Sequence, residues 1–293
     1  MKILEFHTAF PQEKPKRLSE YAIGIFASII SKQGIKKAIK KDLVLVNGTV
    51  GKTATFICGG ELIELCEAEE SNKKPIFELK IAILYEDDEL AIIAKPAGIE
   101  VSGNKFRTIE NALAFNFQKS PLFDALPKPQ PIHRLDFPTT GVLLVGKTRS
   151  SVANLNKLFE EKKVQKTYFA ITLGKEKMQE KGSMETLVDN KKAHSDYQVL
   201  ASTPSEKYGF LNLVKLFPQT GRKHQLRVHL SEIGHPILGD KMYGKQGFIL
   251  QGKGLYLHAF SLEFQHPKTK KTIFATQQIP DKFSNIFSLD AFS

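Results

Sequence analysis

The chain has 293 residues, 41% of them hydrophobic, so it is long enough to bury a sizeable core in each of about two domains. Its 42 Lys and Arg against 31 Asp and Glu give a formal net charge of +11, which favours a polyanionic partner such as nucleic acid. No apolar run approaches the roughly 18 residues of a membrane-spanning helix, and residues 1–7 lack the apolar stretch of a secretory signal. We therefore expect a cytoplasmic protein without a membrane partner.

The two cysteines, Cys58 and Cys66, are too few for a disulfide framework or a zinc site. We expect both to be small, buried apolar residues.

A polar and highly charged stretch at residues 67–76 predicts a linker between two domains, 1–70 (core about 15–66) and 77–293. In the first domain, apolar residues at helical spacing predict a helix: Leu18, Ala22, Ile25, Phe26 and Ile29. A second short helix, expected to begin after Gly34, carries Lys36, Lys37, Lys40 and Lys41. Asn47-Gly48 between two apolar runs predicts a β-hairpin, and residues 61–65 predict a further strand.

This order of elements resembles the small αL RNA-binding module shared by a ribosomal small-subunit protein and bacterial tyrosyl-tRNA synthetase. The matching residues are Arg17-Leu18, Ser31-Lys32, Val44 to Gly48, and Gly60 to Ile63. The resemblance implies that Lys36, Lys37 and Lys40 contact RNA. The alternative is a solvated helix face, which is the commoner fate of a run of charges.

In the second domain, residues 83–95 predict two strands around an acidic turn, and residues 142–147 and 166–173 predict further strands. Residues 151–162 predict a helix. Strands dominate beyond residue 185, so the expected fold class is α+β rather than doubly wound.

The segment His133-Arg134-Leu135-Asp136 follows a proline-rich stretch at 127–131 and precedes the apolar run 142–145. Proline cannot continue a helix or a central strand, so the stretch predicts an extended loop. The apolar run predicts a buried strand. Asp136 is therefore expected on a stiffly held loop, where a carboxylate can meet a substrate.

A second segment, residues 220–233, predicts an amphipathic helix because Leu226, Leu230 and Ile233 fall on one face. Lys223 and Arg227 are expected on its polar side. Cations near a helix N-terminus oppose the helix dipole, so their presence indicates a role in holding an anion or a carboxylate.

These segments together resemble the RluA family of pseudouridine synthases. The shared motifs are His133 to Asp136 followed by Thr139-Thr140-Gly141, Tyr85 to Asp87, Lys95 to Gly98, Lys166 to Tyr168, Arg222 to His229, Gly234 to Asp240, and Leu257 to Ala259. One departure is Val101-Ser102-Gly103, where many members have a histidine and a proline. The resemblance implies a mixed, mostly antiparallel sheet with flanking helices. It implies isomerisation of uridine to pseudouridine in RNA, without a metal or an organic cofactor.

The resemblance also implies roles for individual residues. Asp136 is the catalytic carboxylate, either as a nucleophile or as the group that stabilises a glycal-like intermediate. Arg227 pairs with Asp136, and Tyr168 stacks on the target base and is a candidate proton carrier. The implied RNA-binding residues are Arg134, which fills the space left by the flipped base, and Arg222, His224 and Thr140. Leu255 and Leu257 are expected to pack beneath the base.

Two other functions are compatible with parts of the sequence. A metal hydrolase would explain the proximity of His224, His229 and His235, but on a helix the first two point away from each other, and core packing is the expected role of His229. A non-catalytic RNA-binding ribosome-assembly factor would not need Asp136, Tyr168 and Arg227 together. Large-subunit ribosomal RNA is the favoured substrate, transfer RNA is the alternative, and a monomer is expected.

Overall fold

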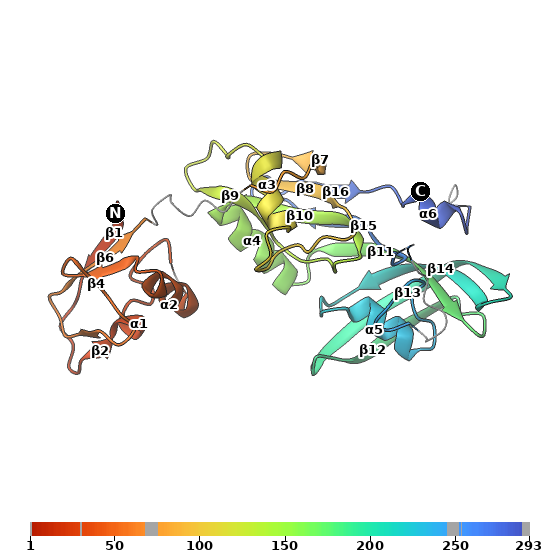
Figure 1. The fold of residues 1–293 in the computed structure, drawn as a ribbon, viewed down its shortest axis with the longest axis horizontal. Coiled ribbons are helices and arrows are strands. Elements are labelled where there is room, and N and C mark those ends of the chain that lie inside the picture. The colour runs from red at the N-terminus through yellow and green to blue at the C-terminus, as the bar shows by residue number, and fades with distance from the viewer. Residues whose placement is uncertain (1, 30, 68–75, 245–251, 253, 289–293) are drawn as a thin grey trace. The chain divides into compact units, whose positions relative to one another are not determined.

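The computed structural model describes residues 2–29, 31–67, 76–244, 252 and 254–288 (Figure 1). The chain divides into two compact units, Met1–Lys74 and Pro75–Ser293. Most of the predicted linker, residues 68–75, lies outside the described residues. In the part of the chain that is described, no helix is both long enough and apolar enough to cross a membrane.

The first unit contains an antiparallel four-stranded sheet with the strand order β1-β6-β3-β4. Its elements are β1 (Ile3–Thr8), β2 (Lys16–Arg17), α1 (Leu18–Tyr21), α2 (Lys32–Lys40), β3 (Val44–Val46), β4 (Thr49–Val50), β5 (Phe56–Ile57) and β6 (Leu62–Cys66). The predicted hairpin is confirmed: Asn47 and Gly48 join β3 to β4 with φ values of 49° and 75°, as a tight hairpin turn requires.

Two predictions for this unit are wrong. The helix expected through residue 29 ends at Tyr21, and Gly24 follows with a φ of 81°. Leu18 and Phe26 are nevertheless fully buried, so the apolar spacing identified core residues although it overestimated the helix. Cys66 is buried as expected, but Cys58 is exposed.

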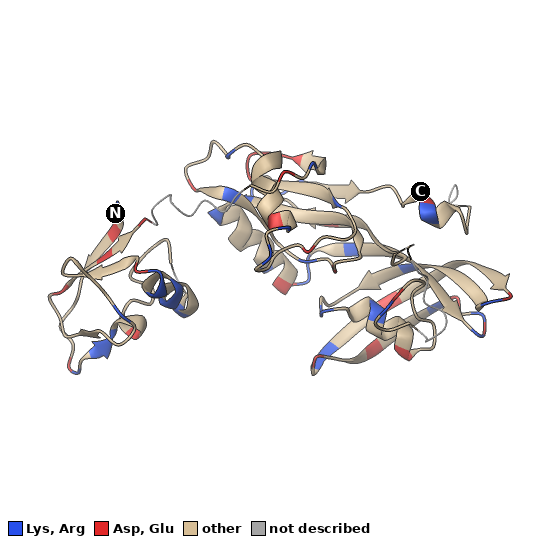
Figure 2. Ribbon diagram, viewed as in Figure 1, with Lys and Arg blue, Asp and Glu red and all other residues tan. Residues whose placement is uncertain are grey.

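Helix α2 begins at Lys32, earlier than predicted, because the Ser31 side chain accepts a hydrogen bond from the Gly34 N–H at 3.0 Å. Its apolar side packs into the core of the unit, and its lysines Lys36, Lys37 and Lys40 are exposed. Figure 2 shows these cations gathered on one helix.

The second unit is built on a ten-stranded sheet with the order β12-β13-β14-β11-β15-β10-β8-β7, in which β16 also pairs with β15 and β9 with β10. The strands are β7 (Ala82–Glu86), β8 (Leu90–Lys95), β9 (Ala125–Pro131), β10 (Thr140–Thr148), β11 (Gln165–Gly174), β12 (Lys181–Val188), β13 (Lys191–Ser205), β14 (Gly209–Pro218), β15 (Leu257–Gln265) and β16 (Thr272–Thr276). The helices are α3 (Ile109–Asn116), α4 (Arg149–Glu160), α5 (Gln225–Glu232) and α6 (Asp281–Ser284). Only the short β10–β15 pairing is parallel among the described strand pairs, so the predicted mixed, mostly antiparallel α+β fold is confirmed.

Different helices cover the two halves of this sheet. α3 and α4 lie over the half that contains β8 to β10, and α5 lies over β12 and β13 (Figure 1). Each half has its own buried apolar cluster. Tyr168 on the central strand β11 packs against both clusters, so it lies where the two halves meet.

The proline-rich stretch 127–131 was predicted to be an extended loop, and this prediction is wrong. The stretch forms part of strand β9. It pairs with β10 through Val145 opposite Pro131 and Gly146 opposite Gln130. Proline is tolerated here because β9 is hydrogen-bonded to β10 alone, so a missing N–H breaks no second ladder.

Candidate active site

A cavity of about 250 Å³ lies where the two halves of the sheet meet. The loop before β10, the C-terminus of α4, strand β11, the segment between β14 and α5, and the start of β15 all contribute to its wall. Its lining residues are His133–Asp136, Thr139, Phe159, Lys166, Tyr168, Pro218, Thr220–Arg227 and Leu257. We refer to it as the base pocket.

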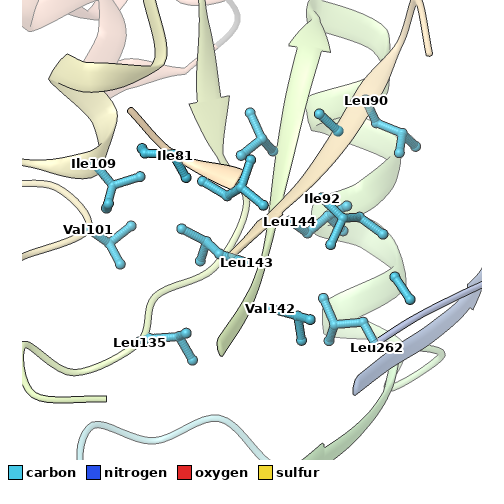
Figure 3. Packing of buried hydrophobic residues seen from close by; sticks show 14 of the residues in the cluster. Ile81, Leu90, Ile92, Val101, Ile109, Leu135, Val142, Leu143, Leu144 and Leu262 are labelled. Carbon is cyan, nitrogen blue, oxygen red and sulfur yellow. The ribbon is translucent and has the colours of Figure 1, made fainter. Parts of the chain in front are cut away.

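Buried Lys95 holds the loop that carries Asp136. The lysine side chain is fully buried at the end of β8, and its Nζ donates to the carbonyl oxygens of Thr139 at 2.8 Å, Pro96 at 3.0 Å and Asp136 at 3.3 Å. Burial lowers the pKa of Lys95 to about 8, against the attraction of the nearby Asp136 carboxylate. Leu135 points from the same loop into the apolar core (Figure 3). The position of Asp136 is therefore fixed from both sides.

Gly141 allows the loop to end where β10 meets β15. Its φ is 125°, and an added Cβ would lie 2.1 Å from the Ala259 carbonyl oxygen, so only glycine fits this close approach. Beside it, the Thr140 hydroxyl and His258 Nδ1 are 2.8 Å apart. Burial lowers the pKa of His258 to about 4, so the ring is neutral at pH 7. Because His258 Nε2 must donate to the Gln277 carbonyl at 3.2 Å, Nδ1 accepts from Thr140.

Arg227 is buried and contacts two carboxylates. Its Nη1 donates to Asp136 Oδ2 at 3.3 Å, whereas its Nε and Nη2 donate to the two oxygens of Asp240, both at 2.8 Å. Asp240 Oδ1 also accepts from the backbone N–H groups of Met242 and Tyr243. These donors hold the pKa of Asp240 below its usual value although burial alone would raise it. Asp240 thus orients the guanidinium that faces Asp136.

The predicted helix at 220–233 begins only at Gln225, because His224 has a left-handed φ of 56°. Gln225 Oε1 accepts from the Thr220 hydroxyl at 2.7 Å and from the Arg222 N–H at 3.0 Å, which ties the preceding loop to the helix. Arg227, which the spacing placed on the polar side of the helix, is only 4% exposed. Ile233, expected in the core, is 40% exposed.

His224 faces the same carboxylate as Arg227. Its Nε2 lies 3.7 Å from Asp136 Oδ1, and its Nδ1 is 3.0 Å from the Tyr243 hydroxyl. Burial lowers the pKa of His224 and outweighs the attraction of Asp136. The guanidinium of Arg227 lies 5.1 Å from the centre of the Tyr243 ring.

Tyr168 forms part of the pocket wall at the junction of the two cores. Burial, followed by the nearby Asp136 carboxylate, raises the pKa of its phenol above the ordinary value. The hydroxyl therefore stays protonated at neutral pH, so Tyr168 can stack and can donate a hydrogen bond.

Comparison with known proteins identifies the family. The sequence pattern of RNA pseudouridylate synthases matches residues 89–232. An RNA pseudouridine synthase of Aquifex aeolicus is 31% identical over 98% of this chain and 96% of its own length. The ribosomal large subunit pseudouridine synthase C of Haemophilus ducreyi is 32% identical over 97% of this chain and 95% of its own length.

The chain belongs to the RluA family of RNA pseudouridine synthases. Two solved human structures share its fold. RNA Pseudouridylate Synthase Domain Containing 1 superposes with a TM-score of 0.58 at 25% identity, covering 72% of this chain and 87% of its own. RNA Pseudouridylate Synthase Domain Containing 4 gives 0.56 at 28% identity, covering 69% of this chain and 90% of its own.

The pocket of the synthase brings together seven of the residues singled out from the sequence: Arg134, Asp136, Tyr168, Arg222, His224, Arg227 and Leu257. The other five do not line it: Lys36, Lys37 and Lys40 belong to α2 of the first unit, and the remaining two are Thr140 and Leu255. Thr140 bonds to His258 behind the loop, and Leu255 is 2% exposed in the core, so neither lines the pocket. His229 is 1% exposed, as expected of a core residue.

Lys95 and Asp240 were not predicted as site residues from the sequence. Both stood in motifs shared with the family, Lys95 in Lys95-Pro96-Ala97-Gly98 and Asp240 at the end of Gly234–Asp240. Their charges were the sequence signal that could have identified them. Lys95 follows one apolar run and Asp240 follows another, and a charged residue that is buried needs a partner.

Proposed function

We propose that this synthase isomerises specific uridines in large-subunit ribosomal RNA to pseudouridine, acting as a cytoplasmic monomer. The observation that carries the proposal is the Asp136 carboxylate, which lies on the wall of the base pocket, 3.3 Å from Arg227. The choice of ribosomal RNA is supported by relatives named for it, including a ribosomal large subunit pseudouridine synthase C of Haemophilus influenzae that is 33% identical over 91% of this chain.

The proposed chemistry breaks the bond between uracil N1 and ribose C1′, turns the base within the pocket, and forms a bond between C5 and C1′. N1 gains a proton and C5 loses one, so the reaction is balanced without an oxidant or a cofactor. The carboxylate of Asp136 acts on the ribose or on the base while Arg227 keeps its oxygens oriented. A desolvated pocket strengthens that interaction, since charges attract more strongly away from water.

The uridine must leave its stack before it can reach Asp136, which costs a few kcal/mol. Tyr168 and Leu257 line the pocket from adjacent strands and supply an apolar surface for the uracil ring. Arg134 is exposed at the pocket wall, next to Asp136 in the loop, in a position to occupy the space that the base leaves in the RNA.

The test is to incubate the purified synthase with transcribed bacterial large-subunit ribosomal RNA and, separately, with transfer RNA, and to map pseudouridine by carbodiimide-dependent primer-extension stops. New stops in the ribosomal RNA are the expected result; stops confined to the transfer RNA would assign the alternative substrate. Asp136→Asn should keep RNA binding and abolish all stops. Asp88→Asn, an exposed site outside the pocket, is the matched control.

A further inference from the structure

A second, larger cavity of about 690 Å³ opens beside the base pocket. The two share six lining residues: Phe159, Lys166, Pro218, Thr220, Gly221 and Arg222. The second cavity extends from them along the end of α4 and the beginning of β11, and its volume is within the range of about 300–1,000 Å³ that small-molecule sites occupy. We refer to it as the flanking cavity. An RNA strand that enters the base pocket can continue into the flanking cavity without leaving the protein surface.

The flanking cavity is lined by cations that have no carboxylate as an ion-pair partner among the described residues. Lys162, Lys166 and Arg222 line it, against one acidic residue, Glu160. Among the described residues none of these three cations forms an ion pair, whereas the neighbouring Lys163 pairs with Glu161 at 2.7 Å. Unpaired cations that face one cavity create a site for an anion.

Lys166 stands at the junction of the two cavities and lines both. Within the described part of the chain its Nζ has one weak partner, the Thr220 carbonyl oxygen at 3.5 Å. Burial lowers the pKa of Lys166 to about 8, so the amine is still mostly protonated at pH 7. Lys166 is partly buried. A partly buried ammonium without a carboxylate is unfavourable, and a phosphate oxygen would supply the missing partner.

An aromatic surface completes the flanking cavity. Phe159 is already stacked on His133, with ring centres 5.0 Å apart. Phe217 is half-buried at the end of β14, and the Lys215 ammonium lies 5.8 Å from the centre of its ring. Stacking on an aromatic ring accepts any base, because every base has a π face.

We propose that the flanking cavity binds the nucleotide next to the target uridine, with the phosphate that joins the two nucleotides paired to Lys166 and the neighbouring base against Phe217. This inference rests on the proposed function. Lys166 and Tyr168 are two residues apart on β11, about 7 Å along the strand. That spacing places the phosphate site directly beside the surface assigned to the uracil ring.

The experiment is phosphate-ethylation interference on the ribosomal RNA. The RNA is lightly ethylated, separated into bound and free fractions with the full-length synthase, and the excluded positions are compared with the mapped pseudouridine. For the wild type, ethylation of one phosphate adjacent to the modified uridine should prevent binding. Lys166→Met should lose that single interference and bind about tenfold more weakly. Lys163→Met, which removes the same charge outside both cavities, should keep the wild-type pattern.

Two further results separate the possible outcomes. Phe217→Leu should weaken binding but keep the interference, because the phosphate contact remains. Tolerance of ethylation at both phosphates that flank the target, or an unchanged pattern in Lys166→Met, would overturn the inference. If the wild type forms no pseudouridine in any RNA, it is the proposed function that fails. Thermal melting of each variant verifies that it is folded.

Discussion

Arg227 is bonded more closely to Asp240 than to Asp136. Two hydrogen bonds of 2.8 Å join its guanidinium to Asp240, and one of 3.3 Å joins it to Asp136. The Asp240 side chain is fully buried, whereas the Asp136 side chain is 14% exposed and faces the pocket. Asp240 therefore fixes the position of the Arg227 guanidinium, which contacts Asp136 through only one hydrogen bond. The Asp136 oxygens remain able to reach a substrate.

Asp240→Asn tests this arrangement. Breaking a buried, hydrogen-bonded ion pair costs about 3–5 kcal/mol of stability, and Arg227 would lose its orientation toward Asp136. Since Asp240 does not line the base pocket, we expect kcat to fall at least tenfold with KM nearly unchanged. Steady-state kinetics and urea unfolding measure the two effects. A variant with reduced stability but wild-type kcat would show that the Asp240 pair is purely structural.

The sequence predicted the members of the pocket better than their contacts. Asp136, Tyr168 and Arg227 stood in separate motifs, and the structure places all three in the lining of one pocket. The Arg227–Asp240 pair was missed because helical spacing shows only that Arg227 lies on the polar side of the helix, and periodicity carries no information about a partner 13 residues away. In the same way, the α+β class followed from the strand patterns and the mostly antiparallel sheet from the family resemblance, whereas strand β9 was missed because its prolines are usually excluded from sheets.

Lys95→Met tests the positioning of the loop that carries Asp136. Methionine has a similar length but no donor, so the carbonyl oxygens that Lys95 satisfies would be left buried without it, at about 1–3 kcal/mol for each unsatisfied group. We expect a lower melting temperature and a lower kcat, with RNA affinity nearly unchanged because Lys95 does not line the pocket. Equal losses in affinity and in kcat would argue that the lysine acts on the RNA itself.

Gly141→Ala should be among the most damaging small substitutions in the chain. The added methyl group would lie 2.1 Å from the Ala259 carbonyl oxygen, and φ is 125°. We expect a loss of at least about 3 kcal/mol in unfolding free energy, together with reduced turnover. Gly234→Ala is the matched control: φ is 83°, but nothing lies within 4 Å of the added Cβ, so only the backbone strain of about 1–2 kcal/mol remains. Similar losses in the two variants would contradict the assigned close approach.

The stability of the synthase should fall in mild acid through His258. Its pKa in the folded protein is about 4, below the usual 6.5, so the unfolded chain takes up a proton that the folded protein refuses. The stability is fully present above pH 6.5 and is lost as the pH falls toward 4, at a limiting slope of about 1.4 kcal/mol per pH unit. Urea unfolding between pH 7 and 5 measures it, and His258→Gln should show a shallower slope.

His194 provides a control because its pKa is shifted in the opposite direction to that of His258. Hydrogen bonds to Asp196 and Glu185 raise the pKa of His194, so this residue favours the folded state increasingly as the pH falls. His194→Gln should therefore lose stability more steeply in acid than the wild type. If both variants changed the slope in the same direction, the assignment of His258 as a neutral acceptor for Thr140 would be wrong.

The lysines of α2 should contribute to RNA binding mainly through phosphates. Lys36, Lys37 and Lys40 are exposed and, among the described residues, form no ion pair. Replacing all three with glutamine in the full chain should lower the magnitude of the slope of log Kd against log salt by about 0.7–0.9 for each phosphate that these lysines neutralise, the range between single strands and duplex DNA. Lys52→Gln is the matched control. The Lys52 ammonium pairs with Asp42 at 2.8 Å in the same unit, so its loss should change the slope little. Filter binding between about 50 and 200 mM salt, the range over which phosphate neutralisation dominates the affinity, makes the comparison. An unchanged slope in the triple variant would mean that the first unit has a role other than holding RNA.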